Sequence, residues 1–232
     1  MSETSRCREI LTKFCVGYGV DVGYGGDPIV PSAITIDLPH PYAKVGGTPL
    51  NLGGDARNLC WFADNSLNYI YSSHLLEDFE PHKTKNMILE WLRVLAIGGN
   101  LILYLPDEQK YKKHCRKTGQ DYNHSHKIEN FNLGYIRGVL REISNIEIIY
   151  KKAACEDYSF EIVLRKTGPT ERMNLSRERK EDEIDWLKKS LVDKDNRTRD
   201  LEQIIPHMRN TKGWRTLDKL RKARNKFGAF RR

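Results

Sequence analysis

The fold of this chain can be read from VGYGVDVGYGGD, residues 16 to 27, where a Val-Gly-Tyr-Gly quartet occurs twice in succession. Residues 14 to 22 include an apolar run that predicts a buried strand leading into the second quartet. Open α/β sheets bind their ligands in the turn that follows such a strand. The second quartet suits that place, because Asp21 ends the strand as an acid facing the crevice. The first quartet then lies inside the strand or at its start.

Apolar runs alternate with helix-like segments over the next 130 or so residues. Strands are predicted at 33–37, near 48–52, at 67–73 and at 100–106, where Pro106 ends the strand. Helices are predicted at 84–96, between a Thr84 cap and Gly98-Gly99, and at 107–117 and 132–143, with a loop rich in His and Asn between the last two. The runs 146–152 and 158–166 predict an antiparallel hairpin. The expected fold is α/β, with a mostly parallel sheet covered on both faces and a terminal hairpin.

Two acids strengthen the interpretation of the glycine-rich turn as a nucleotide site. Asp37 ends the second strand, where it could accept hydrogen bonds from ribose hydroxyls, and Asp55 follows the third strand, within reach of an adenine amino group. A helix cap or a turn is the alternative role for each acid. Only residues 27–33 separate the turn from the second strand, and they include two prolines, so a helix there can have one turn at most. A ligand without phosphate suits this shape better than NAD, whose pyrophosphate needs the N-terminus of a helix there.

Composition excludes several classes of protein. The first fifteen residues carry charges throughout, which argues against a signal peptide, and no run approaches the roughly 18 apolar residues of a spanning helix. Five cysteines without a Cys-x-x-Cys pair argue against a disulfide framework or a zinc knuckle, and indicate free thiols in a reducing cytoplasm. Residues 212–232 hold nine basic side chains and one acid, which accounts for the whole net charge of +8. A partner that needs positive charge would therefore meet the tail.

Five segments together resemble, in order and spacing, the motifs of class I S-adenosylmethionine-dependent methyltransferases. They are Asp21 to Gly26, Ile36-Asp37-Leu38, Gly54 to Leu59, Ser72 to Asp78, and Glu90 to Leu95 with Gly98-Gly99. The resemblance covers about residues 14 to 166 and implies a Rossmann-like methyltransferase domain over residues 1–167. The chain departs from the family pattern in its short first helix and in Asn68, where many relatives carry an acid.

The resemblance implies where S-adenosylmethionine binds. Gly23 and Gly25 would allow close approach of its methionine part, Asp37 would hold the ribose, and Asp55 and Ala56 the adenine. Ser72 to His74 would line the cleft after the fourth strand. The expected cofactor-binding residues are Asp21, Gly23, Tyr24, Gly25, Asp37, Leu38, Asp55, Ala56 and Ser72.

The acceptor and its base are expected in the loop after the fifth strand. If the acceptor is a sugar hydroxyl, a general base is needed, and His126 or His124 is the first candidate, with His74 next. If it is a phosphate, no base is required, and the same histidines with Arg57 would bind charge. The His-x-His spacing has no evident third ligand, so no metal is expected.

The tail predicts two further segments. In residues 168–210, a seven-residue repeat predicts a short coiled coil and a homo-oligomer. Its two series are Ile184, Leu191, Thr198 and Ile205, and Leu187, Lys194, Leu201 and Met208. Because Lys194 and Thr198 are polar, a single solvated helix is the alternative. Residues 211–232 form a basic amphipathic pattern typical of a helix on an anionic membrane surface. A helix packed on the protein itself and a nucleic-acid arm are the alternatives.

This layout resembles bacterial methyltransferases that cap O-antigen polysaccharides at the membrane and end chain growth. The resemblance implies a saccharide or lipid-linked glycan acceptor, and a cytoplasmic protein peripheral to the inner face of the membrane. An RNA or protein methyltransferase that uses the basic tail is a second interpretation, although residues 1 to 211 are neutral overall, which disfavours nucleic acid. A third is a non-catalytic scaffold with the methyltransferase fold, against which the acids Asp37 and Asp55 argue.

Overall fold

The structure is a computed structural model in which two compact units, Met1–Leu175 and Ser176–Arg232, are distinguished. It describes residues 2–38, 49–156 and 158–170, together with Lys188, Leu191, Val192, Lys194, Asp195, Thr198 and Arg199. Within this described part, no helix is both long enough and apolar enough to cross a bilayer.

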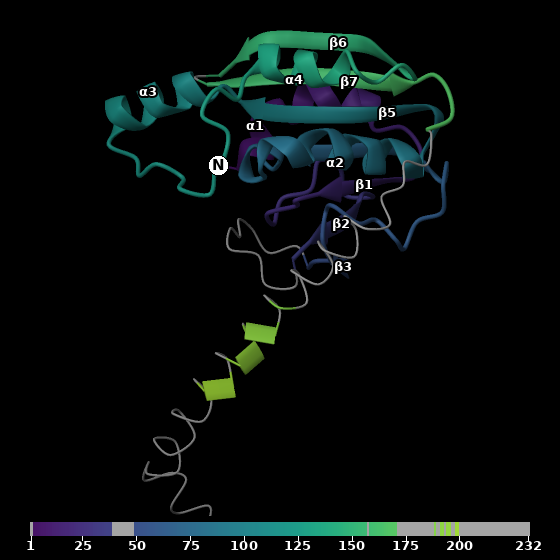
Figure 1. The fold of residues 1–232 in the computed structure, drawn as a ribbon, viewed down its shortest axis with the longest axis horizontal. Helices are drawn as coiled ribbons and strands as arrows, with labels where there is room; N and C mark the ends of the chain where they lie inside the picture. The colour runs from purple at the N-terminus through teal and green to yellow at the C-terminus, as the bar shows by residue number, and fades with distance from the viewer. Residues whose placement is uncertain are drawn as a thin grey trace, which may run out of the picture. The chain divides into compact units, whose positions relative to one another are not determined.

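The first unit is built on a seven-stranded sheet with the order β3-β2-β1-β4-β5-β7-β6 (Figure 1). The strands are β1 (Gly19–Val22), β2 (Ile34–Asp37), β3 (Leu52–Gly53), β4 (Leu67–Ser73), β5 (Leu95–Pro106), β6 (Ile146–Cys155) and β7 (Ser159–Lys166). The first five are parallel, and β7 joins β5 antiparallel and pairs with β6 as a hairpin. The predicted mostly parallel sheet with a terminal hairpin is confirmed.

Helices lie on both faces of the sheet. They are α1 (Glu3–Leu11), α2 (Pro81–Val94), α3 (Glu108–Thr118) and α4 (Leu133–Leu140), with short 3₁₀ turns at Thr12–Phe14 and Leu76–Asp78. Alternate residues of β5 point to opposite faces. Leu101 and Leu103 join the core formed with α2 and α4, whereas Ile102 and Tyr104 join the core formed with α1.

The connection between β1 and β2 contains no helix, as its two prolines predict. Its apolar residues Ile29 and Ala33 pack instead into the core on the α1 face. The carboxylate of Asp21, which is 1% exposed, accepts a hydrogen bond of 2.8 Å from the amide of Ile29. This corrects the expectation for Asp21, because the strand ends one residue later, at Val22, and the acid anchors the connection from inside the protein.

Other boundaries differ from the sequence expectations for local reasons. The first strand begins at Gly19 instead of residue 14, because residues 12–14 form a 3₁₀ turn. Helix α2 begins at Pro81, a residue suited to the first helical position, and Thr84 is buried inside the helix, not at its cap. Helix α2 also ends before the glycines, since β5 starts directly at Leu95 and contains Gly98 and Gly99.

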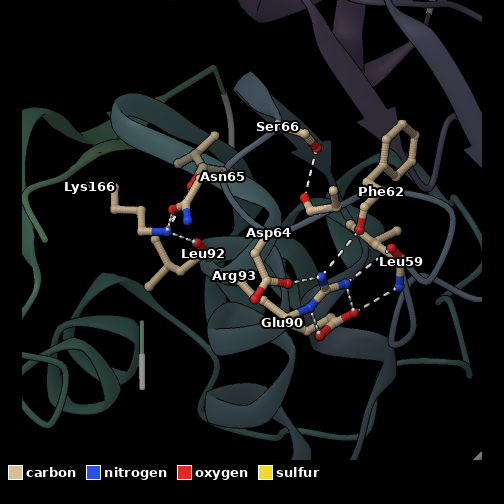
Figure 2. Close-up of polar contacts among 11 residues, drawn as sticks. Leu59, Phe62, Asp64, Asn65, Ser66, Glu90, Leu92, Arg93 and Lys166 are labelled. Atoms are coloured by element: carbon tan, nitrogen blue, oxygen red, sulfur yellow. Dashed lines mark hydrogen bonds and ion pairs between the residues drawn. The ribbon is translucent and has the colours of Figure 1, made fainter. Parts of the chain in front are cut away.

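Arg93 closes the carboxyl end of α2 against the segment before β4 (Figure 2). Its guanidinium bonds to Glu90 and Asp64 at 2.6 to 2.9 Å and donates to the carbonyl oxygens of Leu59 and Phe62. The hydrogen bonds that Arg93 donates to Glu90, followed by that to Asp64, raise its pKa despite its partial burial. The last turn of α2 is thus attached to the connection between β3 and β4.

Lys166, the last residue of β7, is buried at the same helix end (Figure 2). Its ammonium donates to the carbonyl oxygens of Leu92 and Leu95 at 2.6 and 2.7 Å and to the Asn65 side chain at 2.7 Å. The final carbonyls of a helix lack partners within the helix. Lys166 supplies these partners, so α2 can end and β5 can begin without an intervening loop.

The predicted coiled coil and the basic amphipathic helix lie almost wholly outside the described residues. Of the heptad positions, the structure describes Leu191, Lys194 and Thr198, which are helical. Leu191 is 61% exposed within the chain. The coiled coil and the membrane-binding helix therefore remain predictions.

Replacing Lys166 by Met tests its role at the helix end. The variant leaves two buried carbonyl groups without a donor, which costs about 1–3 kcal/mol for each unsatisfied group. We expect the free energy of unfolding in urea to fall by about 2–6 kcal/mol, whereas Lys152→Met, at an exposed position of β6, should change it by less than about 0.5 kcal/mol. Equal effects of the two substitutions would contradict the assignment.

Candidate functional site

The turn after β1 forms a cradle of backbone groups at the point where the strand order reverses. Gly23 and Gly25 have φ angles of +73° and +61°, which L side chains rarely adopt. A Cβ atom built on Gly25 would meet only the Gly23 carbonyl oxygen, at 4.0 Å, so the space in front of this glycine is open. Tyr24, between them, is buried. At Gly25 the turn therefore exposes only backbone atoms to that space.

Asp37 connects the cradle to the end of β2. Its carboxylate accepts hydrogen bonds from the amides of Gly25, at 3.1 Å, and Leu38, at 2.7 Å. Burial raises the pKa of this carboxyl group, and the two amide hydrogen bonds oppose that rise. A carboxylate offers about four acceptor positions, so Asp37 can bind these two amides and still accept from the hydroxyl groups of a ligand.

Asp55 follows β3, as expected, but it is already engaged. Its two oxygens receive the amide and guanidinium of Arg57, at 2.5 to 3.0 Å. The carbonyl oxygen of Ala56 accepts from the indole of Trp91 at 2.8 Å. The adenine contacts expected of Asp55 and Ala56 therefore remain predictions, and sequence reasoning had no signal for the Asp55–Arg57 pair beyond the two-residue spacing.

Trp61 covers the backbone between the two acids. A Cβ atom built on Gly54 would lie 1.8 Å from Cη2 of Trp61, so the indole rests directly on this glycine. The amide of Gly54 donates to the carbonyl oxygen of Asp37 at 2.7 Å. Trp61 is nevertheless 47% exposed. It thus places a partly exposed aromatic ring beside the cradle, a feature that the sequence analysis did not identify.

The end of β4 supplies two buried hydroxyl groups beside β1. Ser72 pairs in register with Val22, the last residue of β1, and Ser73 pairs with Tyr104 of β5. Neither hydroxyl has a hydrogen-bond partner within the described residues. Asn68, by contrast, lies at the amino end of β4, where its side chain accepts from the Tyr18 amide. The departure from the family pattern at Asn68 therefore lies at the other end of the strand from the candidate site.

His74 directly follows β4 and adopts a left-handed conformation, with φ of +48°. Its Nε2 lies 3.1 Å from the Ser159 hydroxyl and 3.6 Å from a Glu3 oxygen, and its Nδ1 lies 3.7 Å from Glu77. Burial lowers the pKa of His74 to about 4, although the Glu3 charge acts in the opposite direction. The imidazole is consequently neutral near pH 7 and able to accept a proton.

The structure separates the two histidines of the loop after α3. His126 points inward, with its side chain only 4% exposed, and its Nδ1 lies 2.7 Å from a Glu108 oxygen. Its Nε2 lies 3.9 Å from Glu77. His124 is exposed and meets the edge of the Tyr122 ring. The structure therefore brings His126 and His74 to the same carboxylate and leaves His124 outside.

Glu3, Glu77 and Glu108 lie beside His74 and His126 and form one cluster with them. The sequence analysis assigned none of these glutamates a role. Glu77 and Glu108 are fully buried, and Glu3 accepts a hydrogen bond of 2.6 Å from the Tyr158 hydroxyl. Burial by itself would raise the pKa of Glu108, but hydrogen bonds from His126 and Tyr122 outweigh it and lower the pKa. Glu77 lies within the Ser72–Asp78 motif, and its apolar neighbours in the sequence could have indicated that its side chain is buried. Glu3 offered no such signal, because 155 residues separate it from Tyr158.

The cluster is polar and proton-exchanging in character. Within residues 2–38, 49–156 and 158–170, no group of three or more His, Cys, Asp or Glu side chains is arranged to hold a metal ion. The cluster places the imidazoles of His74 and His126 beside three carboxyl groups, and side chains of these types can take up and release protons. It lies at the carboxyl ends of β4 and β5, next to the cradle at the ends of β1 and β2.

Comparisons with known proteins bear on the fold. No protein-family model matches the chain, and no protein of curated function matches it by sequence. Several solved structures of S-adenosylmethionine-dependent methyltransferases are similar to it. One from Methanosarcina mazei shares 17% identity, covering 68% of this chain and 97% of its own, with a TM-score of 0.50. One from Archaeoglobus fulgidus shares 13% identity, covering 71% and 95%, with a TM-score of 0.51.

A third similar structure holds a bound cofactor product. The 1,6-didemethyltoxoflavin-N1-methyltransferase of Burkholderia thailandensis, with S-adenosylhomocysteine and 1,6-didemethyltoxoflavin bound, shares 11% identity and has a TM-score of 0.51. The match covers 72% of this chain and 79% of that enzyme. At these identities the likeness concerns the fold. The described residues of the first unit therefore have the fold of class I S-adenosylmethionine-dependent methyltransferases.

Proposed function

We propose that the protein transfers a methyl group from S-adenosylmethionine to a hydroxyl group of a saccharide. The observation that carries this proposal is the juxtaposition of two sites along one sheet edge. The glycine cradle with Asp37 lies at the ends of β1 and β2, and the neutral imidazole of His74 lies at the end of β4. A methyltransferase acting on a hydroxyl needs both a cofactor site and a nearby proton acceptor.

The residues present fit the cofactor. Asp37 retains acceptor capacity for ribose hydroxyls, and the open space at Gly25 allows a ligand to approach the backbone. The buried hydroxyls of Ser72 and Ser73 lie beside the end of β1 and can bond to polar groups of the methionine part. Trp61 offers an aromatic surface for the adenine ring, in place of the Asp55 carboxylate that Arg57 holds. When bound, S-adenosylmethionine would supply an activated methyl group on its sulfonium.

His74 suits the role of general base better than His126 or His124. Nδ1 of His126 lies 2.7 Å from a Glu108 oxygen, and the His126 side chain is only 4% exposed, so an acceptor has less access to it than to His74. His124 lies at the surface and is not part of the cluster. Nε2 of His74 faces the hydroxyl of Ser159, and its side chain is 16% exposed. His74 is therefore the candidate to receive the proton of an acceptor hydroxyl.

The charges around His74 favour a hydroxyl acceptor over a phosphate. Glu3, Glu77 and Glu108 all carry carboxyl groups within the cluster. A phosphate brought into this environment would be repelled by any of these groups that is ionised, and it would need no base. A neutral sugar hydroxyl meets no such repulsion.

We extend the proposal to surface polysaccharide biosynthesis, with O-antigen chain termination as its specific form. The support is the sequence of the tail, residues 168–232, in which a heptad pattern precedes a basic amphipathic pattern. A lipid-linked glycan is assembled at a membrane, so a basic helix would hold the enzyme beside its substrate. The heptad pattern would join copies of the chain into an oligomer.

Cofactor binding is the first test. We expect calorimetric titration to detect S-adenosylmethionine and S-adenosylhomocysteine binding to the wild type, and Asp37→Ala to weaken it by about 10- to 150-fold, the value of a hydrogen bond to a charged group. Glu147→Gln, at an exposed position of β6, should bind like the wild type. Absence of binding by the wild type would refute the enzyme proposal and favour the scaffold interpretation.

Trp61 should report the adenine end of the cofactor. Because its indole rests on Gly54 beside Asp37, we expect addition of S-adenosylhomocysteine to change the tryptophan fluorescence of the wild type. Trp61→Phe should abolish most of that change, while calorimetry shows the affinity lowered by less than about tenfold, since a ring is retained. An undiminished change in the variant would place the adenine elsewhere.

The acceptor is tested by transfer of a tritiated methyl group to a panel of neutral glycans, phosphate-terminated glycans, RNA and protein. We expect label on a glycan hydroxyl. His74→Asn should lower kcat by about 10²–10⁴-fold and change cofactor affinity less than threefold. Asn is chosen because it tolerates the left-handed backbone at this position. Label found only on phosphate, RNA or protein would overturn the saccharide proposal.

A further inference from the structure

The candidate acceptor site contains a continuous series of titratable side chains from four separate segments. Along this series, Glu3 of α1 neighbours His74, which neighbours Glu77, followed by His126 and then Glu108 of α3. The four links measure 3.6, 3.7, 3.9 and 2.7 Å. Acids and imidazoles alternate along the series, so each proton-binding group stands beside one of the other kind.

Glu77 occupies the centre of the series and is its least satisfied member. It is fully buried, and neither of its carboxylate oxygens has a hydrogen-bond partner within the described residues. Leaving an ionised carboxylate in such a place without a partner is costly. The pKa of Glu77 is accordingly raised well above its usual range, first by burial and then by the neighbouring charge of Asp78. Glu77 therefore binds a proton readily, and the imidazoles of His74 and His126 lie beside it at 3.7 and 3.9 Å.

Other charged groups act on the two ends of the series. At the His74 end, Glu3 of α1 raises the pKa of the imidazole and Arg6 lowers it. The rings of Tyr104 and Tyr158 pack against the imidazole. At the Glu108 end, the carboxylate receives the Tyr122 hydroxyl and lies 3.4 Å from the ammonium of Lys112. The Lys112 side chain is 34% exposed, so this end of the series reaches groups that contact solvent.

We propose that Glu77 joins His74 and His126 into one proton-sharing chain, and that this chain receives the proton lost by the acceptor hydroxyl during methyl transfer. The second part rests on the proposed function, whereas the first does not. Glu77 acts through the histidines and touches no substrate, which makes it a positioning and proton-holding residue.

The oxygen–hydrogen bond of the acceptor breaks, and its electron pair forms the new bond to the methyl carbon while the carbon–sulfur bond of the sulfonium breaks with its pair going to sulfur. Nε2 of His74 takes the proton. Glu77, which holds a proton at the start, releases it to Nε2 of His126 and receives the Nδ1 proton of His74 on its other oxygen, while Nδ1 of His126 stays bonded to Glu108. The chain returns to its starting state when the proton leaves to solvent.

The coupling is tested on the full-length protein by following the imidazole ring signals in nitrogen–proton NMR spectra between about pH 4 and pH 8. Groups that share a proton titrate with macroscopic pKa values that belong to the set. We expect the ring signals of His74 and His126 to show a common inflection in the wild type. Glu77→Gln, which keeps the shape and removes the titratable group, should abolish that common inflection.

Glu142→Gln is the matched control, because Glu142 is exposed and forms an ion pair with Lys85 at the surface. It should leave both curves unchanged. Independent single inflections for the two histidines in the wild type, or a common inflection that survives in Glu77→Gln, would overturn the proposal. If Glu77→Gln lacks a native amide spectrum, His126→Asn replaces it, and the His74 inflection should then shift by at least about half a pH unit. An unmoved His74 curve would refute the chain.

Calorimetry with S-adenosylmethionine separates this inference from the proposed function. Glu77→Gln should bind the cofactor within threefold of the wild type, because Glu77 lies in the acceptor cluster and not in the cradle. A wild type that shows the common inflection but binds no cofactor supports the proton-sharing chain and refutes its role in methyl transfer. A wild type that binds the cofactor but lacks the common inflection refutes the chain alone.

Discussion

The pairing of β1 with β4 is the constraint on which the candidate site depends. In the sheet, β2 and β3 lie on one side of this pair and β5 lies on the other. The connections that follow β1 and β4 therefore leave the sheet toward opposite faces. The carboxyl ends of the two strands are consequently not covered by their own connections. The glycine cradle lies on one side of this opening, and His74 with its cluster lies on the other. A cofactor site and an acceptor site on one sheet edge follow from this single feature of the topology.

The missing helix between β1 and β2 changes how one face of the sheet is covered. A short connection with two prolines cannot form the usual helix, so Ile29 and Ala33 fill part of that face themselves, beside α1. The buried Asp21 holds the connection through the Ile29 amide. Because α1 shares this face and carries Glu3, the segment that completes the core also contributes a carboxylate to the acceptor cluster. Helix α1 thus covers part of one sheet face and also contributes to the acceptor cluster.

Burial gives the acceptor cluster its chemical character. Desolvation disfavours the charged forms of both imidazole and carboxyl groups. It therefore lowers the pKa of His74, which keeps the imidazole neutral near pH 7, and raises the pKa of Glu77. Glu108 is affected in the opposite sense, because direct hydrogen bonds from His126 and Tyr122 stabilise its charge. Glu77 and Glu108 therefore differ in their affinity for a proton although both lie beside His126. At the far end of the sheet, Lys166 and Arg93 instead form fixed hydrogen bonds that hold α2.

Sequence alone determined the alternation of strands and helices, the terminal hairpin, the glycine turn and the acids that follow β2 and β3, because these depend on local periodicity and turn chemistry. It placed the cofactor-side residues Gly25 and Asp37 correctly at strand ends, and it misplaced the start of β1 and the cap of α2, where short turns override apolar patterns.

Only the tertiary structure decided which side chains meet. Arg57 engages Asp55, and Glu3 reaches His74 across 71 positions of sequence. Glu77 brings His74 and His126 together, while His124 remains at the surface. Contacts of this kind arise from packing between distant segments, which leaves no periodic signal in the chain.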